Sequence, residues 1–219
     1  MTFLQFLSQN EGTLLQAAGG QIAVVAVVTG VATLVAVSLG ILATRVHWTE
    51  GLVSNTVGVL FTVPSLAFFG IMIPILGLGF IPAAVVLVVY ALLPIFRNTV
   101  AGLNGVPADV KEAAASCGLS ARQRLVRIEL PLAWPVIMAG IRVAVTLTMG
   151  LAAVGAYVGG PGFGHQIFLG IQQVGSPVAL DLVVSGTLGV VILALLADGL
   201  LRFVLVVTRP RGLARLRAA

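Results

Sequence analysis

The longest stretch without a charged residue runs from Leu52 to Phe96, and it does most to limit what this chain can fold into. It holds 45 residues, whereas one helix needs about 20 to cross a hydrocarbon core about 30 Å thick. A second uncharged run, from Ile22 to Thr44, has 23 residues. Only 9% of the chain is charged, against about a quarter in soluble domains. These runs therefore predict membrane-spanning helices and exclude a soluble fold.

Five spans account for the apolar runs. We expect them at about 22–44, 52–71, 81–96, 133–155 and 179–201. Three glycines and two prolines within residues 70–82 predict the turn after the second span. Pro64 predicts a kink inside that span, tolerable where a neighbouring helix satisfies the freed carbonyl. The prediction is an all-α polytopic membrane protein with an external segment 1–21, a transmembrane domain 22–201 and a basic cytoplasmic tail 202–219.

Basic residues predict the orientation. Eleven of the twelve Lys and Arg residues follow the first, third or fifth span: Arg45, Arg97, Lys111, Arg122, Arg124, Arg127, Arg202, Arg209, Arg211, Arg215 and Arg217. With four or six spans, these basic residues would lie on both sides of the membrane. Because cytoplasmic segments carry the excess of positive charge, we expect the N-terminus outside and the C-terminus in the cytoplasm. The arginines of the tail are candidates for binding anionic membrane lipid.

The polar segment 97–131, between the third and fourth spans, has its own helix signals. Pro107 suits a first helical turn, and Gly118 suits a left-handed cap. Ser120 with Gln123 predicts a capping box that starts a second helix, and Pro131 predicts its end, with extended backbone just before it. The expected structure is helix, glycine turn, helix on the cytoplasmic surface. From spacing alone it is either a docking element or a solvated connection between spans.

The same segment carries a family signature. Glu112-Ala113-Ala114, Gly118, Ile128 and Leu130-Pro131, spaced by three, nine and one residues, resemble the EAA motif of ABC importer permeases. The resemblance implies a type I importer fold in the plasma (inner) membrane of a prokaryote. It also implies that these residues form coupling helices, which bind a separate ATPase present in two copies. A second permease chain, identical or related, and an external substrate-binding protein are the other partners that it implies.

Three further stretches narrow the resemblance. TVPSLAFFGIMIPILGLGFIP (62–82), YALLPIFRNT (90–99) and GLNGVP (102–107) are similar to permeases of the osmoprotectant group. That group imports glycine betaine, carnitine, choline and related quaternary ammonium compounds. One departure is His165, which stands where the family often has an acidic residue. Import of another small solute, such as methionine or a sulfonate, and a channel or structural subunit without an ATPase are the alternatives.

Catalysis and metal binding are not expected in this chain. A phosphate-binding loop needs Gly-Lys-Ser/Thr, but the single lysine, Lys111, lies between Val110 and Glu112. We therefore expect no enzyme activity, with ATP and Mg²⁺ held by the partner ATPase. His47 and His165 fall on opposite sides of the predicted membrane, so no metal-ligand pair is expected. The net charge of +5 is interpreted as a topology signal, and no nucleic-acid partner is expected.

Two groups of residues are candidates for the translocation path. Arg142 lies inside the fourth span, where a charge costs about 2.5–3.5 kcal/mol on insertion scales. It should either face another helix or a water-filled path, with Asp198 as a candidate partner, or extend its side chain to the inner membrane surface. Tyr90 could contact a cation in transit. The second group is a candidate external gate in the glycine-rich loop, for which a flexible loop is the alternative: Tyr157, Gly159, Gly160, Gly162 and Gly164.

Overall fold

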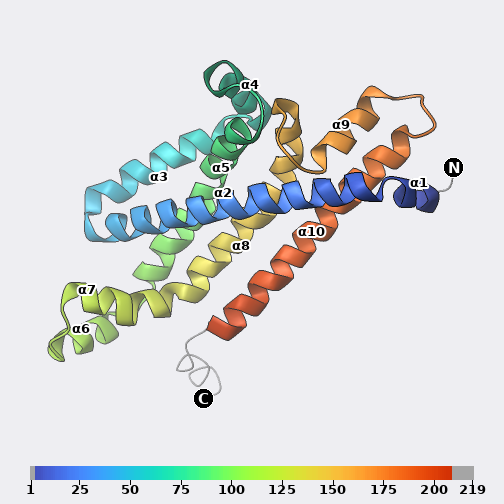
Figure 1. Ribbon diagram of the computed structural model, residues 1–219. Helices are drawn as coiled ribbons and strands as arrows, with labels where there is room; N and C mark the ends of the chain where they lie inside the picture. The colour runs from blue at the N-terminus through green and yellow to red at the C-terminus, as the bar shows by residue number, and fades with distance from the viewer. Residues whose placement is uncertain (1–2, 209–219) are drawn as a thin grey trace.

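The computed structural model describes residues 3–208, and every regular element in that range is helical (Figure 1). The helices are α1 (Phe3–Gln9), α2 (Glu11–Arg45), α3 (His47–Thr62), α4 (Ser65–Leu76), α5 (Phe80–Asn104), α6 (Ala108–Ser116), α7 (Ala121–Arg124), α8 (Leu130–Gly155), α9 (Gly164–Gln172) and α10 (Ala179–Thr208). A π-helical turn, Leu125–Glu129, joins α7 to α8, and a 3₁₀ turn, Ala156–Val158, follows α8.

Four continuous helical stretches of the described chain are long and apolar enough to cross a membrane, and the bent pair α3–α4 makes a fifth if it counts as one span. The four are α2, α5, the continuous stretch Ala121–Val158, and α10. The prediction of an all-α polytopic protein with about five spans is therefore confirmed. The C-terminal ends of α2 and α10 and the polar helices α6 and α7 lie toward one end of the molecule (Figure 1).

Helix α5 is the centre of the packing, because it lies between α2 and α8. Large apolar side chains such as Leu87 and Ile95 are fully buried there. Small residues bring the backbones close together. A Cβ atom added at Gly140 of α8 would lie 2.6 Å from the Cβ atom of Asn98 in α5. Close approach through small residues is the usual way that helices associate in a membrane.

The second span is not the single kinked helix that the sequence predicts. Helices α3 and α4 meet at 94° across Val63 and Pro64. The chain does bend at Pro64, but the helix is interrupted there, because both residues leave the helical conformation, with ψ of 128° and 127°. The hydroxyl of Tyr90 in α5 donates a hydrogen bond to the Val63 carbonyl. A neighbouring helix thus satisfies a carbonyl at the break, as the membrane requires.

The prediction that Pro131 ends the second polar helix was also wrong. Leu130 is helical, with φ −62° and ψ −46°, and the chain continues from α7 through the π turn into α8. The Leu130 N–H donates to the carbonyl of Leu125, five residues back. Proline crowds the carbonyl four residues before it, and the wider π turn spreads the helix at that point. Pro107 lies at the N-cap of α6, just before the first turn.

The ends of the spans differ from the predicted bounds. Helix α2 begins at Glu11, so residues 11–21 continue the first span helix. Part of the stretch 156–178, between the fourth and fifth predicted spans, is helical, and its helix α9 packs against α10. Helix α10 includes Arg202 and extends to Thr208. The rest of the predicted basic tail, 209–219, lies outside the described residues.

Candidate functional site

Helix α6 presents the start of the EAA motif at the surface. Glu112 and Ala113 are exposed, while Ala114 is buried against the rest of the chain. Gly118 follows the helix with φ of +79°, the left-handed conformation that glycine adopts without strain. Within the described residues, the side chain of Glu112 makes no hydrogen bond or ion pair. The exposed face of α6 therefore consists mainly of small side chains, with a negative charge at Glu112, and is accessible to a partner.

The second part of the motif lies where α7 joins the fourth span. Ser120 and Gln123 form the predicted capping box, with reciprocal backbone contacts of 3.3 and 2.9 Å. Ile128, Leu130 and Pro131 are half-buried around the π turn. These three residues shape the joint between the polar helices and the span.

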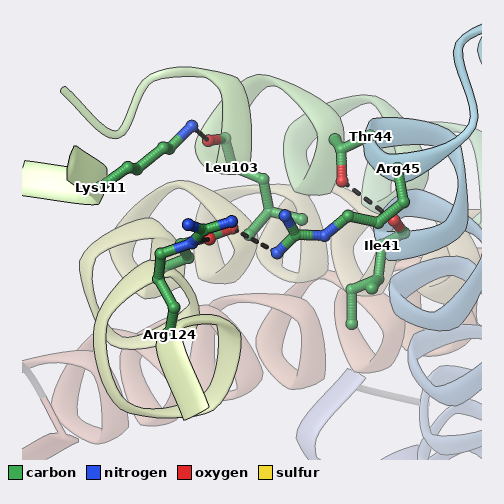
Figure 2. A network of polar contacts seen from close by, with 7 residues as sticks. Ile41, Thr44, Arg45, Leu103, Lys111 and Arg124 are labelled. Atoms are coloured by element: carbon green, nitrogen blue, oxygen red, sulfur yellow. Dashed lines mark hydrogen bonds and ion pairs between the residues drawn. The ribbon is translucent and has the colours of Figure 1, made fainter. Parts of the chain in front are cut away.

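Two polar contacts hold the candidate coupling segment, residues 108–131, against the neighbouring helices (Figure 2). The first is Lys111, whose Nζ donates to the backbone carbonyl of Leu103 at 3.1 Å. The carbonyls in the last turn of a helix lack intrahelical partners, so the ammonium group completes the end of α5. This contact ties α6 directly to the central helix.

The second contact is a buried carboxylate between two arginines. The Glu129 side chain is only 4% exposed. It accepts from Arg45 at 2.7 Å and from Arg124 at 3.0 Å, and Figure 2 shows the two arginines converging from α2 and α7. Glu129 occupies the undefined motif position between Ile128 and Leu130, so sequence reasoning missed it. Arg124 is only five residues away, but the pairing with Arg45, 84 residues away, left no local signal.

The intramembrane arginine also has a carboxylate partner. Arg142 of α8 donates through Nε and Nη2 to Oδ1 of Asp198 in α10, at 2.8 and 2.7 Å. Arg202, one turn after Asp198, contacts the other carboxylate oxygen at 2.8 Å. The three side chains line a groove of about 650 Å³ between α8 and α10. Sequence reasoning named Arg142 and Asp198 and missed Arg202 as a member of this cluster.

Tyr90 lies apart from that groove. Its side chain is 5% exposed and packs against the rings of Phe61 and Phe68, with centroid separations of 5.5 and 6.4 Å. Its hydroxyl is engaged at the break between α3 and α4. In this conformation Tyr90 fixes the bend and does not present its ring to an open path.

The glycine-rich loop is packed against neighbouring helices. A Cβ atom added at Gly162 would collide with Oε1 of Gln21, and one at Gly164 would collide with the Ala153 carbonyl oxygen. Gln21 of α2 is fully buried, donating to the Met149 carbonyl at 2.9 Å and accepting from the Phe163 N–H at 3.2 Å. Sequence reasoning missed this glutamine, because an uncharged polar residue in a span has no distinctive pattern.

The other predicted loop residues are divided between surface and interior. Tyr157 is 54% exposed, and Gly159 is exposed with φ of +76°. Gly160 is buried, and a Cβ atom there would lie 2.9 Å from that of Ala83 in α5. In residues 3–208 no group of three or more His, Cys, Asp or Glu could hold a metal ion.

Comparisons with known proteins agree with this architecture. Residues 14–205 match the family described as binding-protein-dependent transport system inner membrane component. The choline transport system permease protein OpuBB of Bacillus subtilis is 38% identical, over 98% of this chain and 97% of its own length. The glycine betaine/carnitine/choline transport system permease protein OpuCB of the same organism is 39% identical, over 97% of this chain and 95% of its own.

A solved structure shows the same fold. The inward-facing MetNI methionine ABC transporter contains a chain that superposes with a TM-score of 0.77 at 22% identity, covering 90% of this chain and 96% of that one. The two Bacillus relatives are named as permeases, which are the membrane chains of such systems and not their ATP-binding chains. This chain belongs to the binding-protein-dependent transport system inner membrane components, the permeases of ABC importers.

Proposed function

We propose that this chain is the permease of an importer for quaternary ammonium osmoprotectants such as glycine betaine, carnitine or choline. The main support is the likeness to OpuBB and OpuCB over nearly the whole chain, since the names of both proteins specify substrates of this class. Two permease chains, identical or related, would enclose the path. An external substrate-binding protein would deliver the solute at the face that carries the glycine-rich loop. The alternatives are another small solute and a membrane subunit without an ATPase.

Energy for import would come from a separate ATPase with two copies, each holding ATP and Mg²⁺ and each docked on one set of coupling helices. The observation that carries this proposal is the exposed Glu112–Ala113 surface, which is fastened to the spans through Lys111 and Glu129. A partner that moves α6 would therefore also move the ends of α2 and α5. The continuous helix from Ala121 to Val158 offers a rigid route across the membrane.

The proposed orientation places the N-terminus outside and the coupling helices in the cytoplasm, where ATP is available. It is supported by the contacts of Arg45 with Glu129 and of Trp134 with Thr208. These contacts bring the ends of α2 and α10 to the same side as the coupling segment. Arg45, Lys111 and the arginines of residues 122–127 thus gather at this end, as expected of cytoplasmic segments.

The test is co-purification of the tagged chain with its ATPase, comparing wild type with Glu112→Lys and Gly118→Arg. We expect both variants to insert in the membrane but to lose the ATPase, because the first reverses a surface charge and the second puts a large side chain at the turn. Matched controls are Glu11→Lys, an exposed acidic residue at the far end, and Gly175→Arg. Gly175 has φ of +96° and, like Gly118, open space around its Cβ position.

The controls should retain the ATPase. If wild type binds no ATPase, or if the two coupling variants bind it as well as the controls do, this surface is not the docking site. A channel or structural subunit would then explain the chain better. Uptake of radiolabelled glycine betaine, with competition by methionine or a sulfonate, separates the proposed substrate class from the other solutes.

A further inference from the structure

The ion cluster of Arg142, Asp198 and Arg202 lies between α8 and α10, within the part of the chain that crosses the membrane. Charged side chains at this depth are rarely exposed to lipid. Arg142 is in the middle of α8, with about 20 Å of helix on either side of it. The side chains of Arg142 and Asp198 are nevertheless 26% and 24% exposed. A charged group at that depth is costly against hydrocarbon, and such groups usually face a water-filled cavity or a protein interior. The groove is therefore part of a wet or protein-covered surface.

The cluster has unused capacity to bind an anion. It contains two guanidinium groups and one carboxylate, so one positive charge is left without a counter-charge among the described side chains. A guanidinium has five N–H donors. Arg142 directs Nε and Nη2 to Asp198, and no other partner of its side chain lies in residues 3–208. The remaining N–H groups of Arg142 are available to bind one or both oxygens of a carboxylate.

The rest of the groove suits methylated groups. Its wall includes the small or aliphatic side chains of Ala139, Val143 and Ala194, beside the Asp198 carboxylate. A quaternary ammonium group presents methyl groups, and these complement the aliphatic side chains of this wall. A volume of about 650 Å³ is sufficient for a small zwitterion.

We propose that this groove is a transit site for substrates that carry a carboxylate as well as a quaternary ammonium group. Arg142 binds the carboxylate, and Asp198 holds the arginine in place while the site is empty. The inference rests on the proposed function and adds a chemical distinction to it. Glycine betaine and carnitine would use Arg142, whereas choline, which has the ammonium group but no carboxylate, would pass without it.

The experiment measures ATP-driven uptake of radiolabelled glycine betaine and choline into proteoliposomes that hold the complete importer. In Arg142→Gln we expect the ratio of glycine betaine uptake to choline uptake to fall about tenfold or more, the usual effect of losing a charged hydrogen bond. Arg142→Lys should recover part of that ratio, because it keeps the charge but loses the bidentate geometry.

The matched control is Trp134→Phe, which removes the 2.8 Å hydrogen bond from Trp134 to Thr208. That bond also joins α8 to α10 but involves no charge, so any loss should affect both solutes equally. An unchanged uptake ratio in Arg142→Gln would refute the transit site while leaving the importer function intact. A wild-type importer that carries neither solute would overturn the proposed function and this inference with it.

Discussion

Replacing Glu129 by glutamine tests whether the coupling segment is held to the spans by charge. The substitution keeps the size of the side chain and removes its negative charge. In the wild-type chain this one carboxylate, 4% exposed, separates the guanidinium groups of Arg45 and Arg124. In the variant the two arginines would face a neutral amide, and the end of α2 would lose its charged contact with the π turn.

The expected loss of stability depends on how deeply Glu129 and its two arginine partners are buried. Breaking a fully buried ion pair costs about 3–5 kcal/mol. Here the arginine side chains are 36% and 25% exposed, so water recovers part of that energy. We expect a loss of about 2–3 kcal/mol in the free energy of unfolding. For a chain of this length that corresponds to a fall in Tm of about 5–10 °C.

The assay combines thermal unfolding in detergent with transport by the complete importer. We expect Glu129→Gln to keep the ATPase bound, since Glu112 and Gly118 are untouched, but to hydrolyse ATP with reduced substrate import. In a double-mutant cycle with Arg45→Gln, the losses should be non-additive, because the two residues share one contact. A Tm within 1–2 °C of wild type, with transport and hydrolysis still coupled, would refute the reasoning.

Three further outcomes are expected. Cys117 is the single cysteine of the chain and is exposed beside Gly118. It should react with a membrane-impermeant maleimide in inside-out vesicles and not in intact cells. The reverse pattern would show that the proposed topology is inverted. Tyr90→Phe should lose about 1–3 kcal/mol of stability, measured as a lower Tm, because it leaves the Val63 carbonyl unpaired. Tyr157→Phe, at an exposed position, should match wild type. Gln21→Leu should make the glycine-rich loop more sensitive to limited proteolysis, and an unchanged cleavage rate would show that the buried amide does not hold the loop.

Local signals in the sequence predicted local structure well. The capping box at Ser120 and Gln123 and the left-handed Gly118 depend on a few neighbouring residues, and both are present. The two prolines were harder. At Pro64 the chain bends by 94°, and at Pro131 it continues as a helix. Proline removes a donor in both cases, but the result depends on what surrounds it: Tyr90 at the first, and a π turn at the second.

Long-range polar contacts were not predictable in the same way. Glu129 and Arg45 are 84 residues apart, and Gln21 and Phe163 are 142 apart. Pairings of this kind depend on which helix faces meet, and residue type and spacing do not specify this. Arg142 and Asp198 were easier to connect, because charges are so few within the spans that each has few candidate partners.

The bend between α3 and α4 has a consequence for how the chain is inserted during synthesis. With 16 and 12 residues, the two helices are about 24 and 18 Å long, and each is shorter than the hydrocarbon core of about 30 Å. The donor that satisfies the Val63 carbonyl, Tyr90, is 27 residues further along the chain. When α3 and α4 leave the ribosome, their stable arrangement is therefore not yet available. We therefore predict that α3 and α4 reach their final position in the bilayer only after α5 has emerged.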